Sequence, residues 1–173
     1  MVLRLFLLGA ICSLFVLACE AKINDPIPVK TSELSPEQVA HALIIKQKVE
    51  FPKILKELQD NKKKVSHWIW WVFPTEKPGD SEPGPKTYVN LSNVEYIVSN
   101  ANMDAWAQIL EEINKVLKVS IPAGTPSPDI IPKIDHSRIH YALQFWLVKA
   151  GATTKKHPRF FKALSELQKY KWR

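Results

Sequence analysis

Residues 66–74 of the chain read SHWIWWVFP, and this stretch decides which parts of the chain can form the core. It holds three of the six tryptophans, and every residue from Trp68 to Phe73 is apolar. A run this short and this apolar is buried or binds something, and its periodicity alone does not separate helix from strand. Because three indoles within four positions cannot all face one core, we expect the stretch chiefly to build the core and to bring at least one tryptophan to a surface.

The sequence on both sides of this stretch, termed the SHWIWWVFP block below, is typical of helices. Ser35, Pro36 and Gln38 form a capping box with proline at the first helical position, so a helix is expected to begin there. Pro52 falls within the apolar pattern of this helix and is expected to kink or restart it. A second helix is predicted by apolar residues at positions i, i+3, i+4, i+7 and i+11, namely Trp106, Ile109, Leu110, Ile113 and Leu117.

Two further helices are predicted toward the end of the chain. Asp135 can cap the start of the first of them, and Gly151 is placed to terminate it. Pro158 is expected to begin the second. The apolar face that predicts the first of these helices consists of Ile139, Leu143, Trp146 and Ala150.

Two proline-bearing segments, 74–87 and 122–132, are predicted to be long loops. No glycine-rich phosphate loop follows a strand pattern, which disfavours nucleotide folds of the Rossmann or P-loop kind. The sequence therefore predicts an all-α fold, in which residues 35–173 form a single compact multi-helix domain with two long proline-rich loops.

The N-terminus has the layout of an export signal. Residues 1–18 begin with one basic residue and continue as an apolar run that ends in small residues, as a secretory signal peptide does. The run is shorter than the roughly 20 residues of a membrane-spanning helix, which favours a cleaved signal over an anchor. Cys19 follows Val-Leu-Ala as in a bacterial lipobox, so we expect a lipidated Cys19, a tether over residues 19–34, and a membrane lipoprotein facing the periplasm or cell surface. The alternative is ordinary cleavage and a soluble secreted protein.

The formal net charge of +7 raises the question of an anionic partner. The excess lysines cluster at 62–64, 155–156 and 169–173, which is typical of solvated helix ends. Export argues against nucleic acid as the partner. His136 and His140 stand at i and i+4, which is half of a metal site, but the Glu of an HExxH motif is missing. We therefore expect neither a metal nor a cofactor.

Residues 54–58, ILKEL, with the basic run after them and the SHWIWWVFP block, resemble the hallmark of a bacterial domain-of-unknown-function family that is often mislabelled "calpastatin". Gln47 and Tyr88 match a helix glutamine and a loop tyrosine of that family. Asp135 and Arg138 match its Asp-x-x-Lys segment. The resemblance implies an all-α fold of several helices, and it implies no reaction.

The two matched segments are expected to converge on one polar pocket. Its polar lining would come from His67, Tyr88, Asp135 and Arg138. Its apolar floor would come from Trp68 and Trp71. Arg138 would then grip a carboxylate or phosphate. The simpler interpretation is that Asp135 and Arg138, three positions apart, form an ion pair at the start of a helix.

Two functions are consistent with such a pocket. The first is a domain that binds a small ligand or a protein partner through it. The alternative is an enzyme, a hydrolase or lyase acting on a small anionic substrate, with His67 as general acid or base and Asp135 orienting it. A hydrogen bond between these two side chains inside a concave pocket would favour catalysis.

Overall fold

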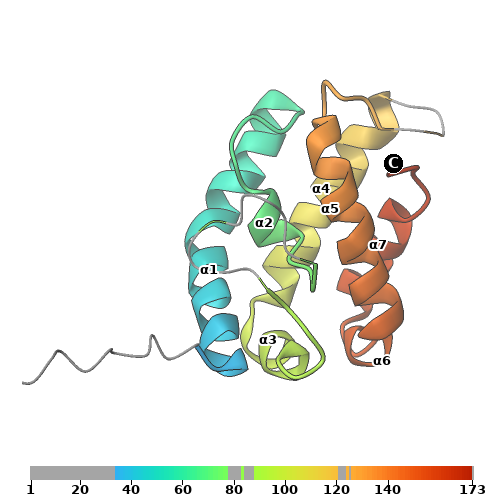
Figure 1. The fold of residues 1–173 in the computed structure, drawn as a ribbon. Helices are drawn as coiled ribbons and strands as arrows, with labels where there is room; N and C mark the ends of the chain where they lie inside the picture. Colours follow the sequence, from blue (N-terminus) through green and yellow to red (C-terminus); the bar gives the residue numbers. More distant parts are fainter. Residues whose placement is uncertain (1–33, 78–82, 84–87, 121–123, 125, 173) are drawn as a thin grey trace, which may run out of the picture. The chain divides into compact units, whose positions relative to one another are not determined.

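The structure, a computed structural model, describes residues 34–77, 83, 88–120, 124 and 126–172 (Figure 1). The predicted signal peptide, Cys19 and most of the proline-rich segment 74–87 lie outside the described residues, as do residues 122, 123 and 125 of the second proline-rich segment. Within them the chain forms α1 (Pro36–Asn61), α2 (Ile69–Val72), α3 (Val94–Asn100), α4 (Met103–Ser120), α5 (Lys133–Leu143), the π-helical segment η1 (Gln144–Lys149), α6 (Gly151–Thr154) and α7 (Pro158–Leu167). The predicted all-α fold is confirmed, since no strand is present in the described part of the chain.

Helix α4 is the central element of the domain. It packs against α1 on one side and against α7 on the other (Figure 1). The five residues that predicted this helix are all buried, with at most 1% of any of them exposed. Their spacing places them in one apolar stripe, and this stripe faces the core between α1 and α7.

Helix α1 begins as predicted and continues further than predicted. The Gln38 amide donates to Ser35 Oγ at 3.2 Å, and the Ser35 amide donates to Gln38 Oε1 at 2.8 Å, which completes the capping box. The helix does not restart at Pro52, because α1 runs on to Asn61. Proline removes one backbone hydrogen bond, while Phe51, Ile54 and Leu58 remain buried against the core.

The start and end predicted for the helix around residues 133–150 also need correction. Asp135 does not cap it, because α5 begins at Lys133 and Asp135 lies in the first turn. Gly151 does not terminate it but begins α6. Between α5 and α6 lies the π-helical segment η1, whose hydrogen bonds span five residues instead of the four of an α-helix. Here the Ala150 amide donates to the Phe145 carbonyl at 2.8 Å. The prediction that Pro158 begins the last helix is confirmed.

The SHWIWWVFP block lies in the core. Trp68 and Phe73 are each 1% exposed, and Trp71 is 5% exposed. Trp70 is only partly buried, which confirms that one tryptophan of the block reaches a surface. Four of its residues form the short helix α2, so the block is helical rather than a strand. No helix within the described ranges is both long enough and apolar enough to span a membrane.

Candidate functional site

Four consecutive backbone carbonyls at the end of the SHWIWWVFP block each accept a hydrogen bond from a distant side chain. Helix α2 has a single turn, so its last carbonyls have no partner within the helix. The donors come from α1, α4, α5 and η1, and the pairs are Gln47 Nε2 to Trp71 O at 2.9 Å, Trp106 Nε1 to Val72 O at 2.9 Å, Arg138 Nε to Phe73 O at 3.1 Å, and Trp146 Nε1 to Pro74 O at 2.9 Å. The block is therefore held by side chains from four separate elements.

The beginning of the block is held by Glu57 of α1. Its carboxylate accepts hydrogen bonds from the Val65 amide at 2.8 Å, from the Ser66 amide at 3.1 Å and from Trp68 Nε1 at 2.7 Å. Partial burial would raise the pKa of the Glu57 carboxyl, but the hydrogen bonds from Ser66, Val65 and Trp68 outweigh burial and lower the pKa. Glu57 is thus a charged anchor for the turn that leads into α2.

The residues predicted to line a pocket from the side of the block lie in different environments. His67 is exposed, and its ring lies beside Trp70 with 6.4 Å between ring centroids. Trp68 and Trp71 are buried in the core. Tyr88 is 40% exposed and forms an isolated bridge with Thr75.

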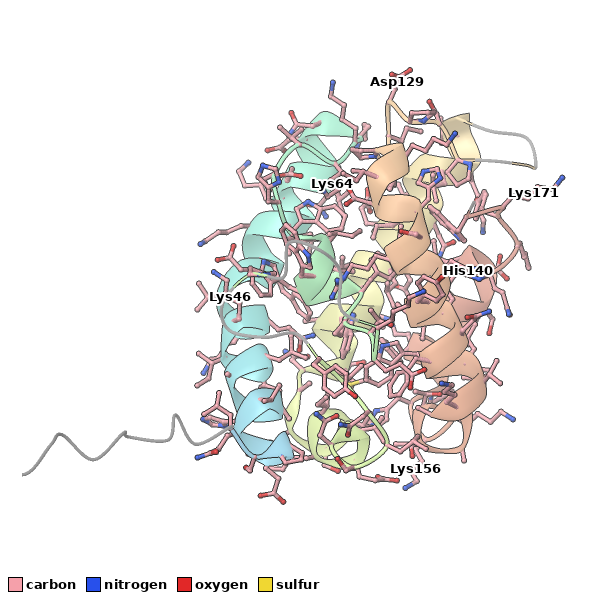
Figure 2. All side chains as sticks on the ribbon, viewed as in Figure 1. Lys46, Lys64, Asp129, His140, Lys156 and Lys171 are labelled. Atoms are coloured by element: carbon pink, nitrogen blue, oxygen red, sulfur yellow. The ribbon has the colours of Figure 1, made fainter. Side chains whose placement is uncertain are left out.

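Asp135 and Arg138 have separate partners, one just before the block and one within it. Asp135 Oδ2 lies 3.0 Å from Lys64 Nζ, and the two side chains are only 12% and 8% exposed. Lys64 is labelled in Figure 2. Arg138 donates to the Phe73 carbonyl. Among the described residues neither His67 nor Tyr88 is hydrogen-bonded to Asp135.

The histidine pair on α5 does not form a metal centre with its neighbours. His136 Nε2 lies 3.0 Å from the Ile131 carbonyl oxygen, and the edge of Trp172 covers its ring. No cluster of three or more His, Cys, Asp or Glu side chains suited to a metal occurs in the part of the chain that the structure describes.

A cavity of about 370 Å³ lies between α1 and the start of α4. Its walls are mainly apolar, with a few carboxamide groups among them. The lining side chains are Ile44, Gln47, Lys48, Phe51, Pro52 and Leu55 of α1, Asn100 of α3, and Asn102, Ala105, Gln108 and Ile109 in and before α4. Apolar walls with a few polar groups are the usual composition of a small-molecule site.

Gln47 is the notable residue of this cavity. It is 2% exposed, and its Nε2 is committed to the Trp71 carbonyl. Its Oε1 has no hydrogen-bond partner among the described residues. The reverse orientation of the amide would bring Oε1 against the Trp71 carbonyl, so the contact with Trp71 fixes which atom remains unpaired.

Sequence reasoning assigned Gln47 no role in the site, although a signal was present. Gln47 stands four residues after Leu43 and four before Phe51, within the apolar stripe of α1. A carboxamide in such a stripe needs a partner in the core, so its position alone indicates a buried hydrogen bond.

A second hollow, of about 610 Å³, lies between α4 and α7. It is lined mostly by charged side chains, and several of these form ion pairs, such as Lys118 with Glu166 at 3.6 Å. Only Val119 and Ala163 contribute apolar lining side chains. The cavity between α1 and α4 is therefore the better candidate for a small-molecule site.

Taken together, the helices, the buried block and its four carbonyl contacts define a small all-α domain built around a tryptophan-rich central turn. Residues 40–166 match the model of the family described as Protein of unknown function (DUF1810), and the chain belongs to that family. The predicted family resemblance is thereby confirmed. No curated protein and no solved structure matched the chain.

Proposed function

We propose that the helical domain binds a small ligand in the cavity between α1 and α4. The observation that carries this proposal is a mainly apolar cavity whose lining includes four carboxamide side chains. Apolar walls with a few polar groups bury a small ligand and fix its orientation. The volume of about 370 Å³ is within the range of natural ligand sites.

The proposed ligand site adjoins the SHWIWWVFP block. Gln47 lines the cavity and its Nε2 donates to the Trp71 carbonyl, so one side chain connects the cavity to the block. The alternative, a hydrolase or lyase using His67, has less support. His67 is exposed, and the carboxylate of Asp135 pairs with Lys64 rather than with an imidazole.

Filling the cavity should abolish binding. Ala105 lines the cavity and is partly buried, so Ala105→Phe would place a ring in the space that the ligand needs. Compounds that raise the melting temperature of the full chain in a metabolite screen should lose at least about tenfold in affinity toward this variant, or ~1.4 kcal/mol. Thermal shift followed by calorimetric titration measures the change.

Ala152→Phe is the matched control, because Ala152 is exposed on α6 and does not line the cavity. Gln108→Trp is a second variant that blocks the same cavity, and Gln108 is exposed. It tests the site even if Ala105→Phe fails to fold. Compounds that bind both blocked variants as tightly as the wild-type chain would overturn the proposed site.

We further propose that the chain is exported and lipidated at Cys19, on the strength of the Val16-Leu17-Ala18-Cys19 sequence after an apolar run. When the full chain is expressed in a bacterial host, it should incorporate labelled palmitate, and the labelled protein should fractionate with membranes. Cys19→Ser should abolish the label, while Cys12→Ser should leave it unchanged. Label that persists in Cys19→Ser would contradict lipidation there and favour the soluble secreted form.

A further inference from the structure

The apolar and polar side chains that line the cavity between α1 and α4 differ in their exposure. Phe51 and Ile109 are 4% and 1% exposed, and Leu55 is partly buried. Gln47 is buried as well, and its amide is bound to the Trp71 carbonyl. The polar lining side chains that are exposed, termed the polar rim below, are Lys48, Asn100, Asn102 and Gln108. The cavity therefore has an apolar interior and a polar opening.

The polar rim carries one positive charge. Lys48 is the one charged side chain among the described residues that line the cavity. The other lysines between residues 46 and 56 of α1 are paired with carboxylates of the same helix, as Lys46–Glu50 at 3.0 Å, Lys53–Glu50 at 3.4 Å and Lys56–Asp60 at 2.6 Å. Lys48 has no carboxylate partner in the part of the chain that the structure describes. Its ammonium group is thus available to a ligand.

Hydrogen-bond donors predominate at the polar rim. Asn102 Oδ1 accepts from the Ala105 amide at 3.0 Å, so its Nδ2 remains as a donor. Within the described residues no hydrogen bond occupies the side-chain amide of Gln108, which can also donate. Only Asn100 is restricted to accepting, because its Nδ2 donates to the Tyr96 carbonyl at 2.8 Å. A positive charge with amide donors near it favours an anionic group at the opening.

We propose that this cavity binds an amphiphilic carboxylate, such as a medium-chain fatty acid, with its apolar tail inside and its carboxylate at the polar rim beside Lys48. This inference rests on the proposed function, and it names the class of ligand that the site takes. Phe51, Leu55 and Ile109 would contact the tail, whose burial supplies most of the affinity.

The exposure of the polar rim makes a charged head group possible. A carboxylate at the opening stays partly hydrated, so it avoids the large cost of burying an ion. One lysine neutralises a monoanion, whereas a phosphate monoester would bring about two negative charges to it. A cationic head group would be repelled by Lys48 and would find no carboxylate among the described lining residues.

Octanoate, octanol and octylamine are matched probes, because they share one tail and differ in the charge of the head group. Calorimetric and chemical-shift titrations of the full chain, below the micelle concentration of each probe, should show octanoate binding about fivefold more tightly than octanol. Octylamine, which is cationic at neutral pH, should bind more weakly than octanol. Added salt should reduce these differences, because Lys48 is exposed and its charge is screened.

The length of the tail tests the apolar interior. Hexanoate has two methylene groups fewer than octanoate, so it should bind roughly tenfold more weakly if these groups are buried in the cavity. Ala105→Phe should abolish the binding of both octanoate and octanol, and Ala152→Phe should leave both unchanged.

Lys48→Met tests the head-group contact, because methionine keeps most of the apolar stem of lysine and removes its charge. The affinity for octanoate should fall by about fivefold and that for octanol should not change. Lys48→Glu should reverse the order, with octylamine binding more tightly than octanoate. Lys53→Met is the control, since it removes the same net charge from an exposed residue of α1 that does not line the cavity.

The possible outcomes separate this inference from the proposed function. Equal binding of octanoate and octanol, blocked by Ala105→Phe, would overturn the ligand class and support the cavity as a site. A preference for octanoate that Lys48→Met leaves intact would overturn the placement of the carboxylate. Octanoate binding that both Ala105→Phe and Gln108→Trp leave unchanged would overturn the site and with it the ligand class. Failure of octanoate to bind the wild-type chain would overturn the inference alone, because the metabolite screen tests the cavity separately.

Discussion

Replacing Trp106 by alanine is expected to lower the free energy of unfolding by about 3–5 kcal/mol. Trp106 is 0% exposed, and its ring packs against Trp146 and Phe160, with 5.2 and 4.8 Å between ring centroids. The alanine variant would therefore leave a cavity where α1, α4, η1 and α7 meet. It would also remove the donor to the Val72 carbonyl. Urea unfolding of the full chain, followed by circular dichroism, measures the loss.

Trp106→Phe separates the two contributions. Phenylalanine keeps an aromatic ring in the core but has no N–H, so the buried Val72 carbonyl loses its partner at a cost of about 1–3 kcal/mol. A phenylalanine variant as stable as the wild-type chain would contradict the view that side-chain donors hold the block in place. The exposed substitution Val148→Ala is a suitable control, since 71% of Val148 is already exposed.

The four carbonyl contacts explain why the block could be found in the sequence while its role could not. The apolar run predicted burial correctly, because burial of Trp68 follows from composition. The partners of the block lie far away along the chain, as with Arg138 and Phe73, which are 65 residues apart. No local pattern specifies such pairs, so Arg138 could be predicted to be important but not to bind a backbone carbonyl.

The starts of helices were predicted well where the signal is local. Ser35 with Gln38, and Pro158, act within their own first turn, and the structure has both helices beginning there. Gly151 was misjudged, and the restart allowed for at Pro52 does not occur, because their effect depends on tertiary packing. The buried Phe51 and Ile54 hold α1 against the core on both sides of Pro52, and α6 begins at Gly151 directly after the π-helical segment.

The candidate site was the least predictable part. The expected pocket needed His67 and Asp135 together, whereas Asp135 is paired with Lys64. The cavity between α1 and α4 depends on the approach of two helices that are far apart in sequence. Two of its lining residues are nevertheless visible in the sequence as breaks in a regular pattern. These are Gln47 in an apolar stripe and Pro52 within a helix.

Replacing Asp135 by alanine is expected to destabilise the domain by about 3–5 kcal/mol, because it leaves the buried ammonium group of Lys64 without its partner. The Lys64 side chain is only 8% exposed, and its Nζ lies 3.0 Å from Asp135 Oδ2. The Lys64 amide also donates to the Ile130 carbonyl at 2.8 Å, which fixes the main chain from which this side chain extends. Equilibrium unfolding in urea at neutral pH measures the effect.

The exposed pair Lys56–Asp60 is the matched control. Its two atoms are 2.6 Å apart, yet the side chains are 76% and 55% exposed. Asp60→Ala should therefore cost no more than about 0.5 kcal/mol, as is usual for helix surface pairs. A loss of similar size in Asp135→Ala would show that the Lys64–Asp135 pair is solvated and not a structural contact.

The double variant Lys64→Met/Asp135→Leu decides what the pair does. If Asp135 serves only to neutralise Lys64, replacing both charges with apolar side chains should recover most of the stability lost in Asp135→Ala, because neither charge then remains buried. Ligand binding in the cavity between α1 and α4 should also be retained, since neither residue lines it. Restored stability together with lost ligand binding would instead place Asp135 in the functional site, as the sequence first suggested.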